Sequence, residues 1–140
     1  MIEKLDINSK YLDDLEIFDV FTKDKVIYDI ENNVFTNYYA YIIDDKAVAF
    51  INYHVMYERS ELININVEEK YQNNKIATKL LEFMINDLIN KKVEDITLEV
   101  KKDNYNAIHL YEKMGFKEIG IRKGYYQGID GILMKKELMV

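Results

Sequence analysis

Apolar and polar residues alternate along several short stretches of the chain, which is the pattern of a half-buried β-strand. In the clearest case, 61–67, Leu62 and two asparagines alternate with Ile63, Ile65 and Val67, which predicts a strand with one apolar face. A hairpin rich in β-branched and aromatic residues is predicted before it, with Asp-Asp-Lys as the turn. The predicted strands cover residues 2–7, 38–44, 47–57, 61–67, 95–100, 116–121 and 131–138.

A helical repeat replaces this alternation in the segment 75–90. Apolar residues return there at helical spacing and form one broad stripe of Ile76, Ala77, Leu80, Leu81, Met84, Ile85 and Leu88. Further helices are predicted at 9–21, with Ser9 as the N-cap, at 24–32, and at 104–115, from Asn104 to a stop at Gly115. The order β-α-α-β-β-β-α-β-α-β-β predicts an α/β (α+β) fold with a mixed sheet, parallel where a helix separates neighbouring strands.

Length and composition narrow the class of protein. The 140 residues are enough for a single domain (1–140) with its own core, and the chain has no cysteine, which fits a reducing cytoplasm. Its net charge of −6 argues against nucleic acid as a partner. No apolar run approaches the roughly 18 residues of a membrane span, and the N-terminus lacks the order of a signal peptide. We therefore expect a cytoplasmic protein that binds neither nucleic acid nor a membrane.

The two halves of the chain differ in charge. Residues 1–70 hold 15 acidic and 7 basic residues (−8), whereas residues 71–140 hold 10 and 12 (+2). An anionic ligand is therefore better placed in the second half and a cationic ligand in the first.

The stretch YQNNKIATKLL, residues 71–81, puts a polar loop between a strand and a helix. Backbone N–H groups of such a loop, at the positive end of a helix, suit a phosphate or pyrophosphate. Asn73 and Asn74 are suitable for this loop because asparagine tolerates left-handed backbone conformations. A plain surface turn is the alternative, since short polar connections between strand and helix are common.

The residues around this loop decide between the two interpretations. Gln72, Ile76 and Ala77 fit the loop Arg/Gln-x-x-Gly-x-Gly/Ala of the GNAT acetyltransferase superfamily, which the chain resembles over roughly residues 61–134. Within that superfamily it is most similar to the bacterial ribosomal-protein-alanine N-acetyltransferases (RimI type). The residues in register with that group are Leu98-Glu99-Val100, Asn104, Ala107, Leu110-Tyr111-Glu112-Lys113, Gly115-Phe116, Arg122-Lys123 and Tyr125-Tyr126.

The resemblance implies a GNAT fold, whose sheet has a V-shaped opening between its fourth and fifth strands, and acetyl-CoA bound there without a metal. Backbone groups of the fourth strand would contact the pantetheine arm, the loop amides would hold the pyrophosphate, and Asn104 would contact the cofactor while also capping its helix. The implied cofactor-binding residues are Ile65, Asn66, Val67, Gln72, Asn73, Asn74, Lys75, Ile76, Ala77, Thr78 and Asn104. Lys75 departs from the family, which has glycine there. It either places its ammonium beside the phosphates or is a solvated lysine.

Acetyl transfer to an amine needs a base for the amine proton and an acid for the departing thiolate. The resemblance assigns these roles to Glu99, acting through water, and to Tyr111. Without it, Glu99 is a solvated strand residue and Tyr111 a half-buried helix aromatic. Tyr125 and Tyr126 match the family near the acceptor and are possible substrate contacts. Since an amine arrives as a cation and the first half of the chain is acidic, we expect an acidic acceptor mouth.

The sequence therefore predicts transfer of acetyl from acetyl-CoA to a primary amine, with the N-terminal α-amine of a protein or peptide as the favoured acceptor. The alternatives are the same reaction on a small amine such as a polyamine, amino acid or aminoglycoside, and a non-catalytic acyl-CoA-binding module. A metal site is not expected from two histidines and no cysteine, nor a serine hydrolase without Gly-x-Ser-x-Gly. Both a monomer and a homodimer are compatible with the sequence.

Overall fold

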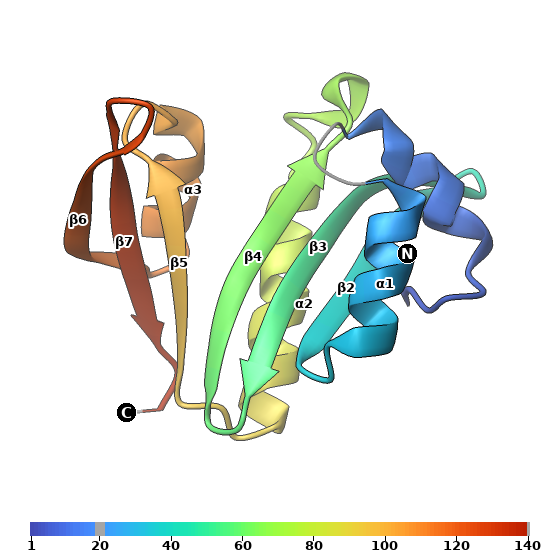
Figure 1. Ribbon diagram of the computed structural model, residues 1–140, viewed down its shortest axis with the longest axis horizontal. Helices are drawn as coiled ribbons and strands as arrows, with labels where there is room; N and C mark the ends of the chain where they lie inside the picture. The colour runs from blue at the N-terminus through green and yellow to red at the C-terminus, as the bar shows by residue number, and fades with distance from the viewer. Residues whose placement is uncertain (19–21, 140) are drawn as a thin grey trace.

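The computed structural model describes residues 1–18 and 22–139, which form a seven-stranded sheet with helices on both faces (Figure 1). The strand order across the sheet is β1-β2-β3-β4-β5-β7-β6. The strands are β1 (Ile2–Lys4), β2 (Thr36–Ile43), β3 (Lys46–Met56), β4 (Arg59–Val67), β5 (Asp95–Lys101), β6 (Lys117–Tyr126) and β7 (Ile129–Glu137). The helices are η1 (Lys10–Ile17), α1 (Lys23–Asn32), η2 (Glu69–Tyr71), α2 (Ile76–Asn90) and α3 (Tyr105–Lys113). The predicted α/β class, mixed sheet and order of elements are confirmed.

Two groups of buried residues lie on opposite faces of this sheet. On one face, α2 lies against β3 and β4 (Figure 1). Leu80, Leu81 and Met84 of its predicted stripe are fully buried there. Helix α3 joins the same group through Tyr111. On the other face, η1 and α1 cover β2 and β3, with Leu15 fully buried. Each fully buried leucine contributes roughly 1.5–3 kcal/mol, so this packing holds the helices against the sheet.

Local signals in the sequence fix several element ends as predicted. The Asn104 side chain accepts a hydrogen bond from the Ala107 N–H at 3.2 Å and caps α3. Gly115 follows the end of α3 with a φ of 96°. The predicted Asp-Asp-Lys turn is one residue too long, because Lys46 already belongs to β3. Asp44 and Asp45 alone connect β2 and β3, both with positive φ, as a type I′ turn requires.

The N-terminal prediction is wrong in part. The first strand ends at Lys4 rather than residue 7, and the described part of the first predicted helix is a 3₁₀ helix, η1, while residues 19–21 lie outside the described residues. Ser9 stands at the N-cap position but makes no side-chain cap. Its hydroxyl oxygen instead accepts a hydrogen bond from the Asp6 N–H at 2.9 Å, because a turn between Asp6 and Ser9 ends the strand early.

The uniform alternation predicted for 61–67 is also wrong. Tyr53 of β3 pairs with Leu62 while Asn52 pairs with Asn64, so Ile63 is an extra residue, a β-bulge. After the bulge the side chains exchange faces, and Leu62 and Ile65 therefore pack on the same core. The bulge directly follows the point where β4 leaves β5, since their parallel pairing ends at Glu61 and Thr97 (Figure 1). This divergence is the predicted V-shaped opening.

The C-terminal strands differ from the prediction in length and neighbours. β6 runs on to Tyr126 instead of ending at 121, and β7 starts at Ile129 instead of residue 131. β7 lies between β5 and β6 and is antiparallel to both, so the strands that α3 connects are not neighbours as the simple rule predicted. Among the described residues, no helix is long and apolar enough to cross a membrane.

Candidate functional site

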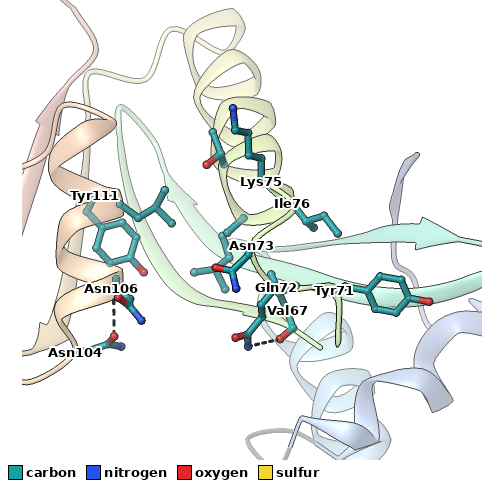
Figure 2. A pocket seen from close by; sticks show the side chains of 14 residues that line it. Val67, Tyr71, Gln72, Asn73, Lys75, Ile76, Asn104, Asn106 and Tyr111 are labelled. Atoms are coloured by element: carbon teal, nitrogen blue, oxygen red, sulfur yellow. Dashed lines mark hydrogen bonds between the residues drawn. The ribbon is translucent and has the colours of Figure 1, made fainter. Parts of the chain in front are cut away.

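A cavity of about 630 Å³ lies between the start of α2, helix α3 and the end of β4 (Figure 2). Its lining combines apolar side chains with side-chain amides, hydroxyl groups and the Lys75 ammonium. The lining residues are Ile65, Val67, Tyr71, Gln72, Asn73, Lys75, Ile76, Ala77, Thr78, Asn104, Asn106, Ala107, Leu110 and Tyr111.

The loop before α2 presents its backbone to this cavity. Asn73 and Lys75 adopt left-handed conformations, with φ of 66° and 62°. The Gln72 side chain donates to the Val67 carbonyl at 3.1 Å, and Asn74 donates to the Tyr71 carbonyl at 3.2 Å, which closes the loop on itself.

The N-terminus of α2 leaves its first amides available. The Lys79 N–H donates to the Lys75 carbonyl at 3.0 Å, and Lys75, at the N-cap, provides no side-chain cap. The N–H groups of Ile76, Ala77 and Thr78 therefore have no acceptor inside the helix. Together with the left-handed residues before them they form a concave set of donors at a positive helix end, which suits a phosphate or pyrophosphate.

Helix α3 supplies the opposite wall. Figure 2 shows Asn104, Asn106 and Tyr111 on the α3 side of the cavity, facing the loop that carries Asn73. Tyr111 is only 7% exposed, and its ring packs on Phe116 with 5.8 Å between centroids. Burial raises the pKa of the Tyr111 phenol to about 12, so the phenol keeps its proton throughout the physiological range.

A smaller cavity of about 250 Å³ occupies the opening between β4 and β5. It shares Ile65, Asn104 and Tyr111 with the larger cavity, so the two are adjacent. Glu99 lines only the smaller one, and Tyr111 lines both. The opening between the strands thus brings together the two residues to which the sequence assigned proton transfer.

Glu99 does not stand alone in this cavity. Arg122 donates from Nε to Glu99 Oε2 at 2.7 Å and from Nη2 to Glu99 Oε1 at 2.6 Å. These bonds lower the pKa of the Glu99 carboxyl, although burial opposes them. The expected acidic acceptor mouth is therefore not seen at Glu99, because Arg122 balances its charge and Lys101 lies over the neighbouring Tyr126 ring.

The larger cavity collects most of the cofactor residues proposed from the sequence, namely Ile65, Val67, Gln72, Asn73, Lys75, Ile76, Ala77, Thr78 and Asn104. Asn66 lines the smaller cavity instead. Asn74 lines neither, because its side chain bonds within the loop.

Sequence reasoning missed some residues of the larger cavity, namely Tyr71, Asn106, Ala107 and Leu110. Helical spacing from Asn104 and Tyr111 could have found Ala107, which lies three positions from the first and four from the second, but it does not lead directly to Asn106 or Leu110. Within the described residues, no group of three or more His, Cys, Asp or Glu side chains could hold a metal ion.

A model of the acetyltransferase (GNAT) family matches residues 6–116, which is well over half of the chain. The chain belongs to the GNAT acetyltransferase family. A relative within it, the [ribosomal protein bS18]-alanine N-acetyltransferase of Escherichia coli K12, is 40% identical over 86 residues, or 61% of this chain and 58% of the relative. The chain therefore spans somewhat more than half of that relative's length.

Another relative and a solved structure extend the comparison. The N-alpha-acetyltransferase of Saccharolobus solfataricus is 34% identical over 115 residues, which cover 72% of this chain and 69% of that protein. The crystal structure of the E. coli ribosomal-protein-S18-alanine N-acetyltransferase superposes with a TM-score of 0.85 at 26% identity, covering 100% of this chain and 96% of that one. The GNAT fold predicted from the sequence is therefore confirmed over the whole sheet.

Proposed function

We propose that the protein is an N-acetyltransferase that moves acetyl from acetyl-CoA to a primary amine, with the N-terminal α-amine of a protein or peptide as the favoured acceptor. The observation that carries this proposal is the adjacency of the two cavities. Free amides at the start of α2 open into one, Glu99 lines the other, and Tyr111 lines both.

The residues present fit acetyl-CoA. The amides from Asn73 to Thr78 would hold its pyrophosphate by backbone donors, which depend little on side-chain identity. The apolar side chains of Ile65 and Val67 line the path from there toward the opening between β4 and β5, and backbone groups of Ile65, Asn66 and Val67 would bond the pantetheine arm. When bound, acetyl-CoA supplies an activated acetyl group on a thioester.

Two side chains would carry out the proton transfers of the reaction, one to the departing thiolate and one from the amine. Tyr111 carries its proton at neutral pH and would give it to the departing thiolate. Glu99 stays ionised and would accept the amine proton through a water molecule. A carboxylate with a lowered pKa is a weak base, so it works best on an amine that gives up its proton readily. An α-amine has an ordinary pKa of about 8, against about 10.4 for lysine, and is therefore the better acceptor.

The named relatives point to the same acceptor. The E. coli relative acts on an alanine of a ribosomal protein and the Saccharolobus relative is an N-alpha-acetyltransferase, according to their names. Tyr125 and Tyr126, at the end of β6, lie with their rings 5.0 Å apart beside the pair of Glu99 and Arg122. We propose them as contacts for the acceptor peptide, and a cytoplasmic location for the reaction.

A turnover assay tests the proposal. Purified protein with acetyl-CoA is offered peptides with free N-termini, the same peptides with N-terminal acetyl blocks and one lysine, and small amines including a polyamine and an aminoglycoside, with thiol release as the readout. We expect the free N-terminal peptides to give the highest kcat/KM. Faster turnover of a small amine would replace the favoured acceptor. Tight acetyl-CoA binding without turnover of any amine would favour a binding module.

A further inference from the structure

Arg122 reaches Glu99 across a strand that carries no side chain at the crossing point. In the register of the sheet, Gly131 of β7 pairs with Lys101 of β5 on one side and with Arg122 of β6 on the other. Side chains at paired positions lie on one face of a sheet, as do positions two apart along a strand. Arg122 and Glu99 therefore share a face, with Gly131 between them.

Gly131 leaves the room that the Glu99–Arg122 pair needs. A Cβ at position 131 would lie 2.6 Å from Glu99 Oε2 and 3.0 Å from the Tyr126 ring, so the carboxylate could not keep its place beside any other residue. The glycine is not required by its backbone conformation, since its φ is not in the left-handed region. Its lack of a side chain thus serves the carboxylate.

The guanidinium is held from a second side. Its central carbon lies 3.5 Å from the centroid of the Tyr125 ring, which stacks on it, while two of its nitrogens bond both oxygens of Glu99. The planar arginine fork matches a carboxylate in this way and a lysine does not. The carboxylate orientation is therefore fixed by two bonds and by the stacking that anchors their donor.

Stabilisation alone does not account for this arrangement. The Arg122 side chain is 48% exposed, and ion pairs at exposed positions contribute little to folding. The pair instead stands at the smaller cavity, where Glu99, at 15% exposure, is the partly enclosed member. The other ionisable groups beside the pair are Tyr125 and Tyr126 on β6, Lys101 on β5 and Tyr111 on α3, and the facing strand β4 lines the cavity with the neutral Asn64 and Asn66.

We propose that Arg122 is a positioning residue, which acts through Glu99 by holding its carboxylate in one orientation at the acceptor cavity. This role rests on the proposed acetyl transfer, and it gives Arg122 a purpose beyond its match to the family pattern. It predicts that Arg122 matters only while Glu99 is present.

The test is a double-mutant cycle with two further variants. Kinetics with an N-terminal peptide are measured for Arg122→Gln, Glu99→Gln and the double variant, for Arg122→Lys, and for Lys123→Gln as a control with the same change of charge one residue away. We expect Arg122→Gln to lower kcat/KM on the order of tenfold, less than the roughly 10²–10⁴-fold of a general base. In the Glu99→Gln background the same change should have no effect. Arg122→Lys keeps the positive charge and should retain only part of the wild-type kcat/KM. Lys123→Gln should have the kcat/KM of the wild type.

Equal losses from Arg122→Gln with and without Glu99 would overturn the proposal, because Arg122 would then act on the acceptor or the fold directly. A loss smaller than about twofold would overturn it as well.

A titration of the Glu99 carboxyl by ¹³C NMR separates this proposal from the proposed function. Arg122→Gln should raise the pKa of Glu99, whereas Lys123→Gln should not. If the wild-type protein acetylates no amine, the proposed function fails, and the titration still decides whether Arg122 controls Glu99. An unchanged pKa in Arg122→Gln would end the proposal.

Discussion

The two sides of the site are built from different parts of the polypeptide. On the α2 side, the donors are backbone amides, and Lys75, where the resemblance implies a glycine, has a left-handed conformation. On the β5 side, side chains make the site. The position of the Glu99 carboxylate depends on the hydrogen bonds from Arg122 and on the space left by the absence of a side chain at Gly131. A site made of backbone tolerates substitution as long as the loop keeps its shape. A site made of side chains does not.

The largest effect should come from a substitution at Ala77, where the backbone of α2 would approach the pyrophosphate of acetyl-CoA. Ala77 lines the cavity in the first turn of α2. Ala77→Glu would place bulk and a negative charge among the amides proposed for the pyrophosphate, so we expect acetyl-CoA binding to be lost in isothermal titration calorimetry. Ala77→Gly is the matched control, and its affinity should stay close to that of the wild type. Unchanged affinity in a folded Ala77→Glu protein would place the phosphate site elsewhere.

A second substitution separates chemistry from binding where the two cavities meet. Tyr111→Phe keeps the ring packed on Phe116 and removes only the hydroxyl. We expect kcat to fall by roughly 10²–10⁴-fold, the usual contribution of a general acid, while acetyl-CoA affinity changes little. Since burial raises the pKa of Tyr111 to about 12, its ionisation should not limit the wild-type rate between pH 6 and about 9. A loss below about threefold would make Tyr111 a packing residue.

The third substitution removes the carboxylate of the side-chain site. Glu99→Gln should lower kcat/KM at neutral pH by about 10²-fold, the lower end of the general-base range, because an α-amine of pKa about 8 is already partly neutral. As pH rises toward the pKa of the acceptor, the amine loses its proton to water and the loss should shrink. With a lysine acceptor the rescue should need a higher pH.

The control for this prediction is the pH profile of the wild type. Because Arg122 lowers the pKa of Glu99, the carboxylate is ionised over the whole range from pH 6 to 9 and adds no inflection of its own. Identical profiles for Glu99→Gln and the wild type would exclude Glu99 as the base.

The sequence predicted the backbone side of this comparison better than the side-chain side. Helical spacing and capping at Asn104 placed α2 and α3, and the polar loop between strand and helix indicated a nest of amides. These are local signals, which residues close in the chain determine. The N-terminal helix was the exception, because the Asp6–Ser9 turn competes for the hydroxyl that would have capped it.

The side-chain site depends on pairing between distant strands, which no local pattern contains. Arg122 lies 23 positions from Glu99, and it meets the carboxylate only because β7 inserts between β5 and β6 with Gly131 at the crossing. The bulge at Ile63 is also a matter of pairing with β3, although the adjacent apolar residues Leu62 and Ile63 interrupt the alternation at that point of the sequence. The sequence pattern matched both Glu99 and Arg122 to the family. Only the order of the strands shows that Arg122 hydrogen-bonds the Glu99 carboxylate.

The smallest expected effect concerns Lys75, at the position where the resemblance implies a glycine. A non-glycine residue in a left-handed conformation costs roughly 1–2 kcal/mol. Glycine removes this cost, but it also raises the conformational entropy of the unfolded chain, which offsets part of the stabilisation. We therefore expect Lys75→Gly to raise the free energy of unfolding in urea by up to about 1 kcal/mol. Lys75→Asn is the matched control, because asparagine also tolerates this conformation and, like glycine, lacks the ammonium. If the ammonium lies beside the phosphates, both variants should lose the same few-fold in acetyl-CoA affinity, and the loss should fade at high salt. Full affinity in both variants would leave Lys75 a solvated lysine, and the backbone alone would account for the phosphate site.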